Sequence, residues 1–263
     1  MLRARYSVAI VLCVLSASTA FSKKAPIISE SELAQITERG RALYQYDQVA
    51  WHATDAVLAT HPSKGEDGRY IAQRTDKGWV VAFGHLNQTR DAFLIAHLAT
   101  RGTADQEFSV EHLATPKQDT GFFLAAAKAI DLSLQDFQGE NRPYNTAVLP
   151  APAGQLYVYV LPAITKDGVY LVGGDERYTV SADGNTLVEK HRMHHSIITM
   201  DMNNVPQGSK VEAGYHVHVL SDVPEDSDVL YVLTRKPPMP EFIGVDGKMR
   251  YQIKEDGTIL PQK

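Results

Sequence analysis

The sequence predicts an α+β protein whose sheet is mostly antiparallel and whose N-terminal part forms a long helix. Apolar residues recur at helical spacing from Leu33 to Leu58, which is typical of an amphipathic helix. Short β-like runs follow, and turn pairs such as Asp183-Gly184 separate them, as in β-hairpins. Strands joined by hairpins pair antiparallel, so the sum of these elements is α+β.

The first residues have the pattern of a secretory signal peptide. Arg3 and Arg5 precede an apolar run over residues 8–15, and small residues follow up to Ala20. The run is too short to span a bilayer. We therefore expect residues 1–20 to be removed as a signal peptide and the mature protein to be periplasmic or secreted.

Composition narrows the class of function. The chain contains one cysteine, Cys13, which lies in the signal segment, so the exported protein would contain none. Disulfide scaffolds and thiol chemistry are therefore excluded. The net charge of −5, without a basic patch, argues against nucleic acid or anionic membranes as partners. No later stretch is apolar enough to span a membrane. The partner that we expect is a protein or peptide ligand.

Residues 21–140 are predicted to form a helix, an antiparallel meander and a second helix. The first helix is expected to end at about Thr60. The second is expected to start at Thr115-Pro116, with proline in its first turn, and to run through Ile130. The strands of the meander are expected at residues 69–74, 79–85 and 93–99.

Two features of the first helix need an explanation. Gly40 interrupts it at a cost of about 1 kcal/mol relative to alanine. Tyr44, Asp47, Trp51 and Asp55 lie along one side, at three- and four-residue steps. They could form a binding face with Trp51 as a stacking platform, or the helix could dock on a sheet with Trp51 in the core. The second interpretation is favoured, because apolar helical stripes usually face a core.

Residues 137–154 are rich in glycine, proline and asparagine and mark either a domain boundary or one long surface loop. Residues 155–263 are expected to be β-rich, as a separate region or as one continuous domain with residues 21–140. A helix is predicted over residues 224–235, with acids in its first turn. Strands are expected at 156–164, 169–171, 177–180, 186–193, 216–220, 242–245 and 249–253.

The chemistry in this sequence is concentrated at His216 and His218. Alternate residues of a strand point the same way, so these two imidazoles would share one face, about 7 Å apart at Cα. Two imidazoles at that spacing can share a metal ion, and Asp228 could be a third ligand. A catalytic zinc ion would also need an open position for water, whose pKa the metal lowers to about 7.

The order of these residues resembles the JAB/MPN (JAMM) metallopeptidase family. The shared pattern is His-x-His, a loop, an Asp at a helix start, and then a hairpin over residues 241–250. The resemblance implies a JAB/MPN-like fold for the C-terminal half, with zinc held by His216, His218 and Asp228, and hydrolysis of peptide or isopeptide bonds. The chain as a whole also resembles exported bacterial proteins.

Two differences from that family keep a second hypothesis open. Val219 stands where the family has proline, and Glu225 stands where it has serine. The general base of such a hydrolase would be Glu176, Glu189 or Glu225. The alternative is a non-catalytic exported module that binds a partner on the same scaffold.

A third interpretation of the segment is a cupin barrel that binds a metal or a small molecule. Residues 205–208 ahead of His-x-His, and the apolar residues 230–233, are similar to the first cupin motif, with Asp222 as the acid. This interpretation requires residues 229–235 to form a strand.

A second histidine cluster could belong to the same site. It consists of His191, His194 and His195. On a continued strand, His191 and His195 would share a face and could line the site from a neighbouring strand, although such groups are more often solvated strand ends.

Overall fold

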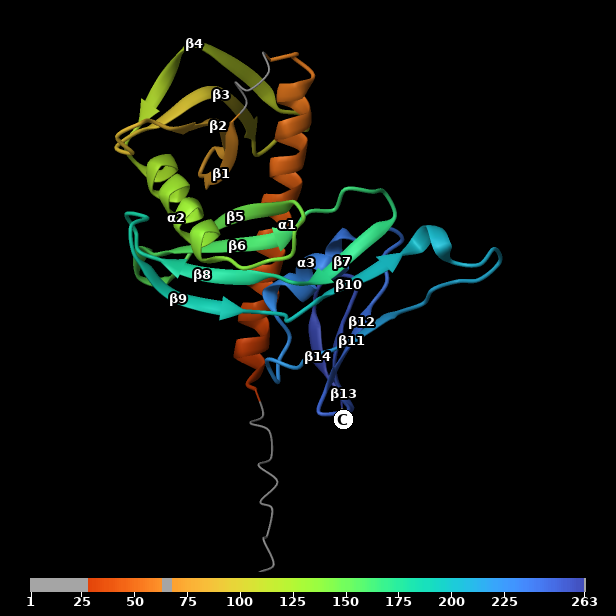
Figure 1. Ribbon diagram of the computed structural model, residues 1–263. Helices are drawn as coiled ribbons and strands as arrows, with labels where there is room; N and C mark the ends of the chain where they lie inside the picture. Colours follow the sequence, from red (N-terminus) through yellow and green to blue (C-terminus); the bar gives the residue numbers. More distant parts are fainter. Residues whose placement is uncertain (1–27, 63–67, 263) are drawn as a thin grey trace, which may run out of the picture.

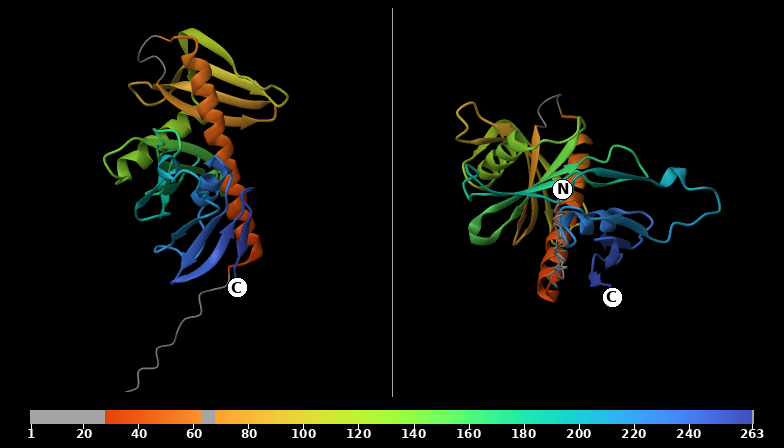
Figure 2. Two further views of the ribbon diagram at one scale, coloured as in Figure 1. Left: turned by 90° about the vertical axis from the view of Figure 1, so that its right-hand side faces the viewer. Right: turned by 60° about the horizontal axis from the view of Figure 1, so that its bottom comes forward.

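A computed structural model describes residues 28–62 and 68–262 of the chain. The long helix α1 (Glu30–Leu58) runs along the molecule, and the sheets lie one after another beside it (Figures 1 and 2). The arrangement is α+β with mostly antiparallel pairing, as predicted. The predicted signal peptide, residues 1–20, lies outside the described residues. No helix in the described part of the chain is both long and apolar enough to cross a membrane.

Helix α1 starts with a reciprocal cap. The Ser29 hydroxyl accepts a hydrogen bond from the Glu32 backbone N–H at 3.2 Å, and the Glu32 carboxylate accepts one from the Ser29 backbone N–H at 2.9 Å. These bonds satisfy donors that have no partner within the helix, which fixes where the helix begins.

The first sheet is an antiparallel meander in the order β1-β2-β3-β4. Its strands are β1 (Arg69–Thr75), β2 (Gly78–Leu86), β3 (Phe93–Gly102) and β4 (Ser109–Asp119). Helix α2 (Phe122–Asp136) packs between this sheet and the next, with its alanines and Ile130 in the core. The first three strands agree with the predicted meander.

The predicted start of the second helix at Thr115-Pro116 is wrong. These residues belong to β4, which pairs with β3 up to Asp119 opposite Phe93. Helix α2 starts at Phe122, three residues after Asp119. The Asp119 carboxylate accepts hydrogen bonds from the backbone N–H groups of Phe123 and Leu124. Pairing with the neighbouring strand β3 therefore overrode the local proline signal.

The second sheet has the antiparallel order β5-β6-β8-β9. Its strands are β5 (Tyr144–Pro150), β6 (Leu156–Pro162), β8 (Glu176–Val180) and β9 (Leu187–Arg192). Strand β7 (Val169–Gly173) pairs separately with β10 (Ile197–Asp201), which was not predicted. Short 3-10 turns lie at Pro152–Gly154 and Met202–Asn204.

The segment 137–154 is not a loop throughout, because it contains β5. This strand pairs along its whole length with β6, from Tyr144 opposite Pro162 to Pro150 opposite Leu156. Its side chains enter both cores next to the first sheet: Ala147 and Leu149 pack with α1, and Val148 packs with α2.

The third sheet has the order β11-β12-β13-β14. Its strands are β11 (Gly214–Val217), β12 (Glu241–Val245), β13 (Lys248–Ile253) and β14 (Ile259–Pro261). Strands β11 and β12 are parallel, and helix α3 (Asp226–Thr234) forms the crossover between them. The helix predicted over residues 224–235 is confirmed.

Helix α3 packs directly on α1 at Gly40. A Cβ atom at this position would lie 2.6 Å from the Asp226 carbonyl oxygen and would overlap the Val229 side chain. The glycine therefore allows the two helices to approach closely, which explains its presence in the middle of a helix.

A buried ionic network joins the same helices to the second sheet. Asp226, at the start of α3, is fully buried. Its carboxylate accepts hydrogen bonds from Arg39 Nε at 3.0 Å, from the Tyr159 hydroxyl at 2.8 Å and from the Arg177 guanidinium. These partners come from α1, β6 and β8, so the network fixes the N-terminal end of α3.

The expectation that Trp51 lies in the core is wrong. Its side chain is 51% exposed, and the Lys236 ammonium lies 5.9 Å from the ring centroid. The buried stripe of α1 passes through Tyr46, Ala50 and Ala53 instead. Trp51 follows Ala50 directly and is therefore rotated about 100° away from that stripe.

Replacement of Gly40 tests the helix contact. We expect Gly40→Ala to lower the free energy of unfolding by about 1–3 kcal/mol through overpacking, although helix propensity alone favours alanine by about 1 kcal/mol. Urea denaturation measures the change. Glu38→Ala, on the exposed side of α1, is the control and should change stability by less than about 0.5 kcal/mol. A Gly40→Ala protein more stable than the wild type would contradict the close contact.

Candidate metal centre

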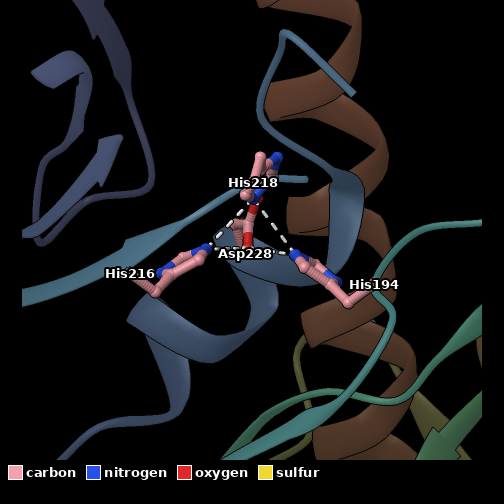
Figure 3. Close-up of side chains that lie close together, drawn as sticks. All are labelled: His194, His216, His218 and Asp228. Carbon is pink, nitrogen blue, oxygen red and sulfur yellow. Dashed lines mark hydrogen bonds and ion pairs between the residues drawn. The ribbon is translucent and has the colours of Figure 1, made fainter. Parts of the chain in front are cut away.

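Four buried side chains meet where the second sheet, the third sheet and α3 come together (Figure 3). His216 lies on β11, His218 follows the end of that strand, and Asp228 lies in the first turn of α3. His194 comes from the turn between β9 and β10. The crossover from β11 through α3 brings Asp228 over the two histidines, so the grouping of His216, His218 and Asp228 expected from the sequence is present.

The potential ligand atoms of these four residues lie within 4.8 Å of one another. His218 Nε2 is 3.0 Å from His216 Nε2 and 3.1 Å from His194 Nε2. One carboxylate oxygen of Asp228 is 3.1 Å from His216 Nε2 and 3.2 Å from His194 Nε2, and the other is 3.2 Å from His218 Nε2. All three rings therefore present the same nitrogen, Nε2, to one small volume.

Each imidazole is oriented by a partner on its other nitrogen. His194 Nδ1 is 2.8 Å from the Asp175 carboxylate, and His216 Nδ1 is 2.7 Å from the Glu241 carboxylate. His218 Nδ1 is 2.8 Å from the Val223 carbonyl oxygen. A carbonyl oxygen can only accept, and a carboxylate beside a ring nitrogen accepts as well, so all three Nδ1 atoms donate.

A neutral imidazole carries one N–H, and these acceptors place it on Nδ1 when the three rings are neutral, which is the form that binds a metal. The Nε2 lone pairs therefore converge, together with the carboxylate of Asp228. Three lone pairs and one anion repel each other unless a cation lies among them. One carboxylate oxygen of Asp228 is buried and makes no hydrogen bond of good geometry to any described residue, although two Nε2 atoms lie within 3.2 Å of it. The group could hold a metal ion.

The ionisation of the site reflects the same need for positive charge. Burial lowers the pKa of His216, but Asp228 and Glu241 outweigh it and raise the pKa of His216 to about 9. Burial opposes protonation of His194 as well, yet Asp175 and Asp228 raise the pKa of His194. Burial would raise the pKa of Asp228, but the three histidines hold the pKa of this carboxyl well below its usual range. Protons or a metal ion can supply this charge, and a bound metal would displace the protons.

The cluster lies under the surface beside one small cavity. His194, the most accessible of the four, is 8% exposed, and Asp228 is fully buried. The cavity has a volume of about 40 Å³ and reaches His194 and His216. Its other lining residues are mainly apolar: Val172, Met193, His195, Ser196, Ile198, Val217, Val219 and Leu220.

The three glutamates expected as bases lie outside this group of ligand atoms. Glu176 is buried and bonded to the Tyr178 hydroxyl at 2.5 Å. Glu189 lies on β9, at 3.5 Å from the Thr179 hydroxyl. Glu225 is buried beside α3, and its carboxylate is 2.9 Å from His191 Nε2. Glu225 lies closest in the chain to a potential ligand, Asp228. Its backbone N–H also donates to the Asp228 carboxylate at 2.7 Å.

His194 is the member of the site that the two-histidine pattern did not include. The sequence pattern predicts a cluster of His191, His194 and His195 in which His191 and His195 share the face toward the site. The chain instead leaves β9 at Arg192, so strand alternation does not apply at His194. His195 is exposed, and His191 bonds Glu225 rather than the cluster.

The cupin interpretation lacks the strand that it requires. Residues 229–235 fall in α3 and its C-terminal cap, not in a β-strand. Asp222, the acid of that interpretation, is not part of the group of potential ligands, and Asp228 takes the central position.

No protein family model, curated protein or solved structure matches the chain. A metal site is therefore indicated by the geometry of the four side chains.

Replacing the histidines one at a time tests which of them binds metal. We expect His194→Ala to weaken zinc binding by more than about 100-fold, the upper end of the loss caused by removing an outer-shell partner. The neighbouring His195→Ala should bind zinc like the wild type, because this exposed ring lies outside the cluster. Competition with a chromophoric chelator measures both affinities. Equal affinities in the two variants would exclude His194 as a ligand.

Proposed function

We propose that this protein is an exported, non-catalytic zinc-binding module in which His194, His216, His218 and Asp228 hold the ion. The observation that carries the proposal is the convergence of three Nε2 lone pairs on a buried carboxylate, with every Nδ1 committed to a fixed acceptor. Such outer-shell acceptors are the usual partners of metal-binding histidines.

The donor set favours zinc among the common metals. Three imidazoles and one carboxylate suit zinc, whereas calcium and magnesium prefer oxygen ligands alone. Zinc binds imidazole nitrogen at about 2.0–2.1 Å, so the corners of a zinc tetrahedron lie about 3.3 Å apart. Five separations between Nε2 and carboxylate atoms are 3.0–3.2 Å, close to that value, and all the potential ligand atoms lie within 4.8 Å of one another.

The number of protein ligands favours a structural role for the ion. Catalytic zinc usually has three protein ligands and one open position, whereas structural zinc has four. His194 supplies the fourth here. The bound ion would tie the turn after β9 to β11 and to the start of α3, which are far apart in the sequence.

Metal analysis of the purified protein tests the proposal. We expect one zinc ion per chain and its loss in His216→Ala. Restoring zinc to the metal-free protein should raise the free energy of unfolding by about 4 kcal/mol when free zinc is 1,000-fold above Kd. His85→Ala, on β2 in the first sheet, is the control and should keep its zinc. A wild-type protein that contains no transition metal and gains no stability from zinc would exclude the proposal.

The second candidate function is a zinc-dependent amide-bond hydrolase of the JAB/MPN kind. The cavity that reaches His194 and His216 supports it, because a substrate needs a path to the metal. Zinc would then polarise the amide carbonyl and activate water. His194 is the ligand that would have to leave, since it lies in a turn and is the most accessible of the four. Of the three glutamates, Glu225 is the candidate base because it lies nearest in the chain to a ligand, Asp228.

Hydrolysis assays separate the two candidates. If the site is closed, neither the wild type nor His194→Ala should cleave a panel of peptide and isopeptide substrates, because the ion only stabilises the fold. If His194 blocks an open position, His194→Ala at saturating zinc should cleave at least one substrate, and Glu225→Gln in that background should lower the rate about 100-fold or more. Asp228→Asn serves as the metal-deficient control for contaminating proteases.

A non-catalytic module would bind a protein or peptide ligand. Exposed apolar side chains beside the cavity support such a contact: Ile198, Val217, Val219 and Leu220. Apolar residues gathered at one exposed place are typical of interaction surfaces. The signal-peptide pattern supports export, and fractionation of cells that express the full chain would test it.

A further inference from the structure

Arg235 is a buried cation at the C-terminal end of α3. It is 1% exposed, and its guanidinium lies 3.9 Å from the centroid of the Tyr231 ring. Its Nη2 donates to the Glu241 carboxylate, whereas Nε and Nη1 make no hydrogen bond to any described residue. Burying a guanidinium in this way costs free energy that one ion pair does not fully offset. The position of Arg235 therefore needs a reason beyond stability.

Glu241 connects Arg235 to the metal site. It is 1% exposed and lies at the start of β12, beside β11. One carboxylate oxygen binds Arg235, and the other accepts from His216 Nδ1 at 2.7 Å. The chain of contacts runs from guanidinium to carboxylate to imidazole, and the far nitrogen of that imidazole faces Asp228 at 3.1 Å.

The backbone leaves room for this chain of contacts at one residue. Gly214 opens β11, opposite Glu241 in the parallel register. A Cβ atom on Gly214 would overlap the Glu241 carboxylate and lie 2.8 Å from Arg235 Nη1. The absence of a side chain here therefore permits the ion pair to sit against the strand that carries His216.

We propose that Arg235 is a positioning residue for the zinc site, acting through Glu241 on His216. The inference rests on the proposed zinc site. Arg235 fixes the Glu241 carboxylate in the orientation that accepts from Nδ1 of His216. The ring is thereby held in the tautomer whose Nε2 lone pair points at the metal. Among the three ligand histidines, His216 is the one whose outer partner is itself held by a buried arginine.

Zinc titration of Arg235→Met tests this role. Methionine keeps the apolar bulk and removes the donors. We expect Arg235→Met and Glu241→Gln each to weaken zinc binding by about 10–100-fold. The double variant should bind zinc no more weakly than Glu241→Gln alone, because Arg235 acts through Glu241. Arg235→Lys, which keeps the positive charge and N–H donors, should retain part of the affinity.

A second readout does not depend on zinc. In the metal-free wild type, the His216 Nδ1 proton should give a slowly exchanging NMR signal, which should be lost in Arg235→Met. Arg69→Met is the matched control. It removes an arginine of the first sheet that pairs with Asp131 on α2, far from the site. It should leave the zinc affinity and the His216 signal unchanged.

The outcomes separate the two proposals. A wild-type protein that binds zinc, with Arg235→Met and Glu241→Gln both within twofold of it, would overturn the role of Arg235 alone. A double variant that binds zinc much more weakly than Glu241→Gln would show that Arg235 does not act through Glu241. That result would also overturn the proposed role of Arg235. A wild-type protein that binds no zinc would overturn the proposed function, and with it this inference. If Arg235→Met does not fold, Arg235→Lys and Glu241→Gln still decide, because zinc affinities within twofold of the wild type in both would overturn the role of Arg235.

Discussion

Three imidazole nitrogens and one carboxylate converge on a small volume among buried residues, and this convergence is the constraint that any account of the site must satisfy. Each Nδ1 is committed to an acceptor, so the inward-facing atoms carry lone pairs and need a cation. The four residues come from a turn, a strand, the end of that strand and a helix. A cation at their centre would hold together the turn after β9, strand β11 and the start of α3.

The position of Asp228 is determined by contacts outside the metal centre. Two residues earlier, Asp226 is held by Arg39, Arg177 and Tyr159, which come from α1 and the second sheet. Gly40 allows α1 to approach this same turn of α3. The helix start is therefore fixed before any metal binds, which limits the entropy lost when the site forms. The long helix α1 contributes no ligand, yet it determines where one ligand lies.

The two functions considered differ in one ligand. With His216, His218 and Asp228 alone, a zinc ion would have an open position and the site would match that of a hydrolase. His194 fills that position, and its Nδ1 is held by Asp175. The small apolar-lined cavity beside His194 is the one feature of the site that favours access from outside. Four potential ligands, against one small cavity, are the reason that a structural role is proposed for a bound ion.

Local sequence patterns were enough to predict the fold class, the helices α1 and α3, the first three strands of the meander and the grouping of His216, His218 and Asp228. These follow from local periods: helical spacing, strand alternation and helix-start acids. Tertiary structure alone decided the rest. Strands β4 and β5 form because each pairs with a neighbouring strand, and β10 forms because it pairs with the more distant β7. His194 joins the site because the turn after β9 brings it there. Arg235 and Glu241 reach His216 through a parallel pairing across the α3 crossover. Contacts between residues far apart in the chain leave no local period, so a single sequence does not reveal them.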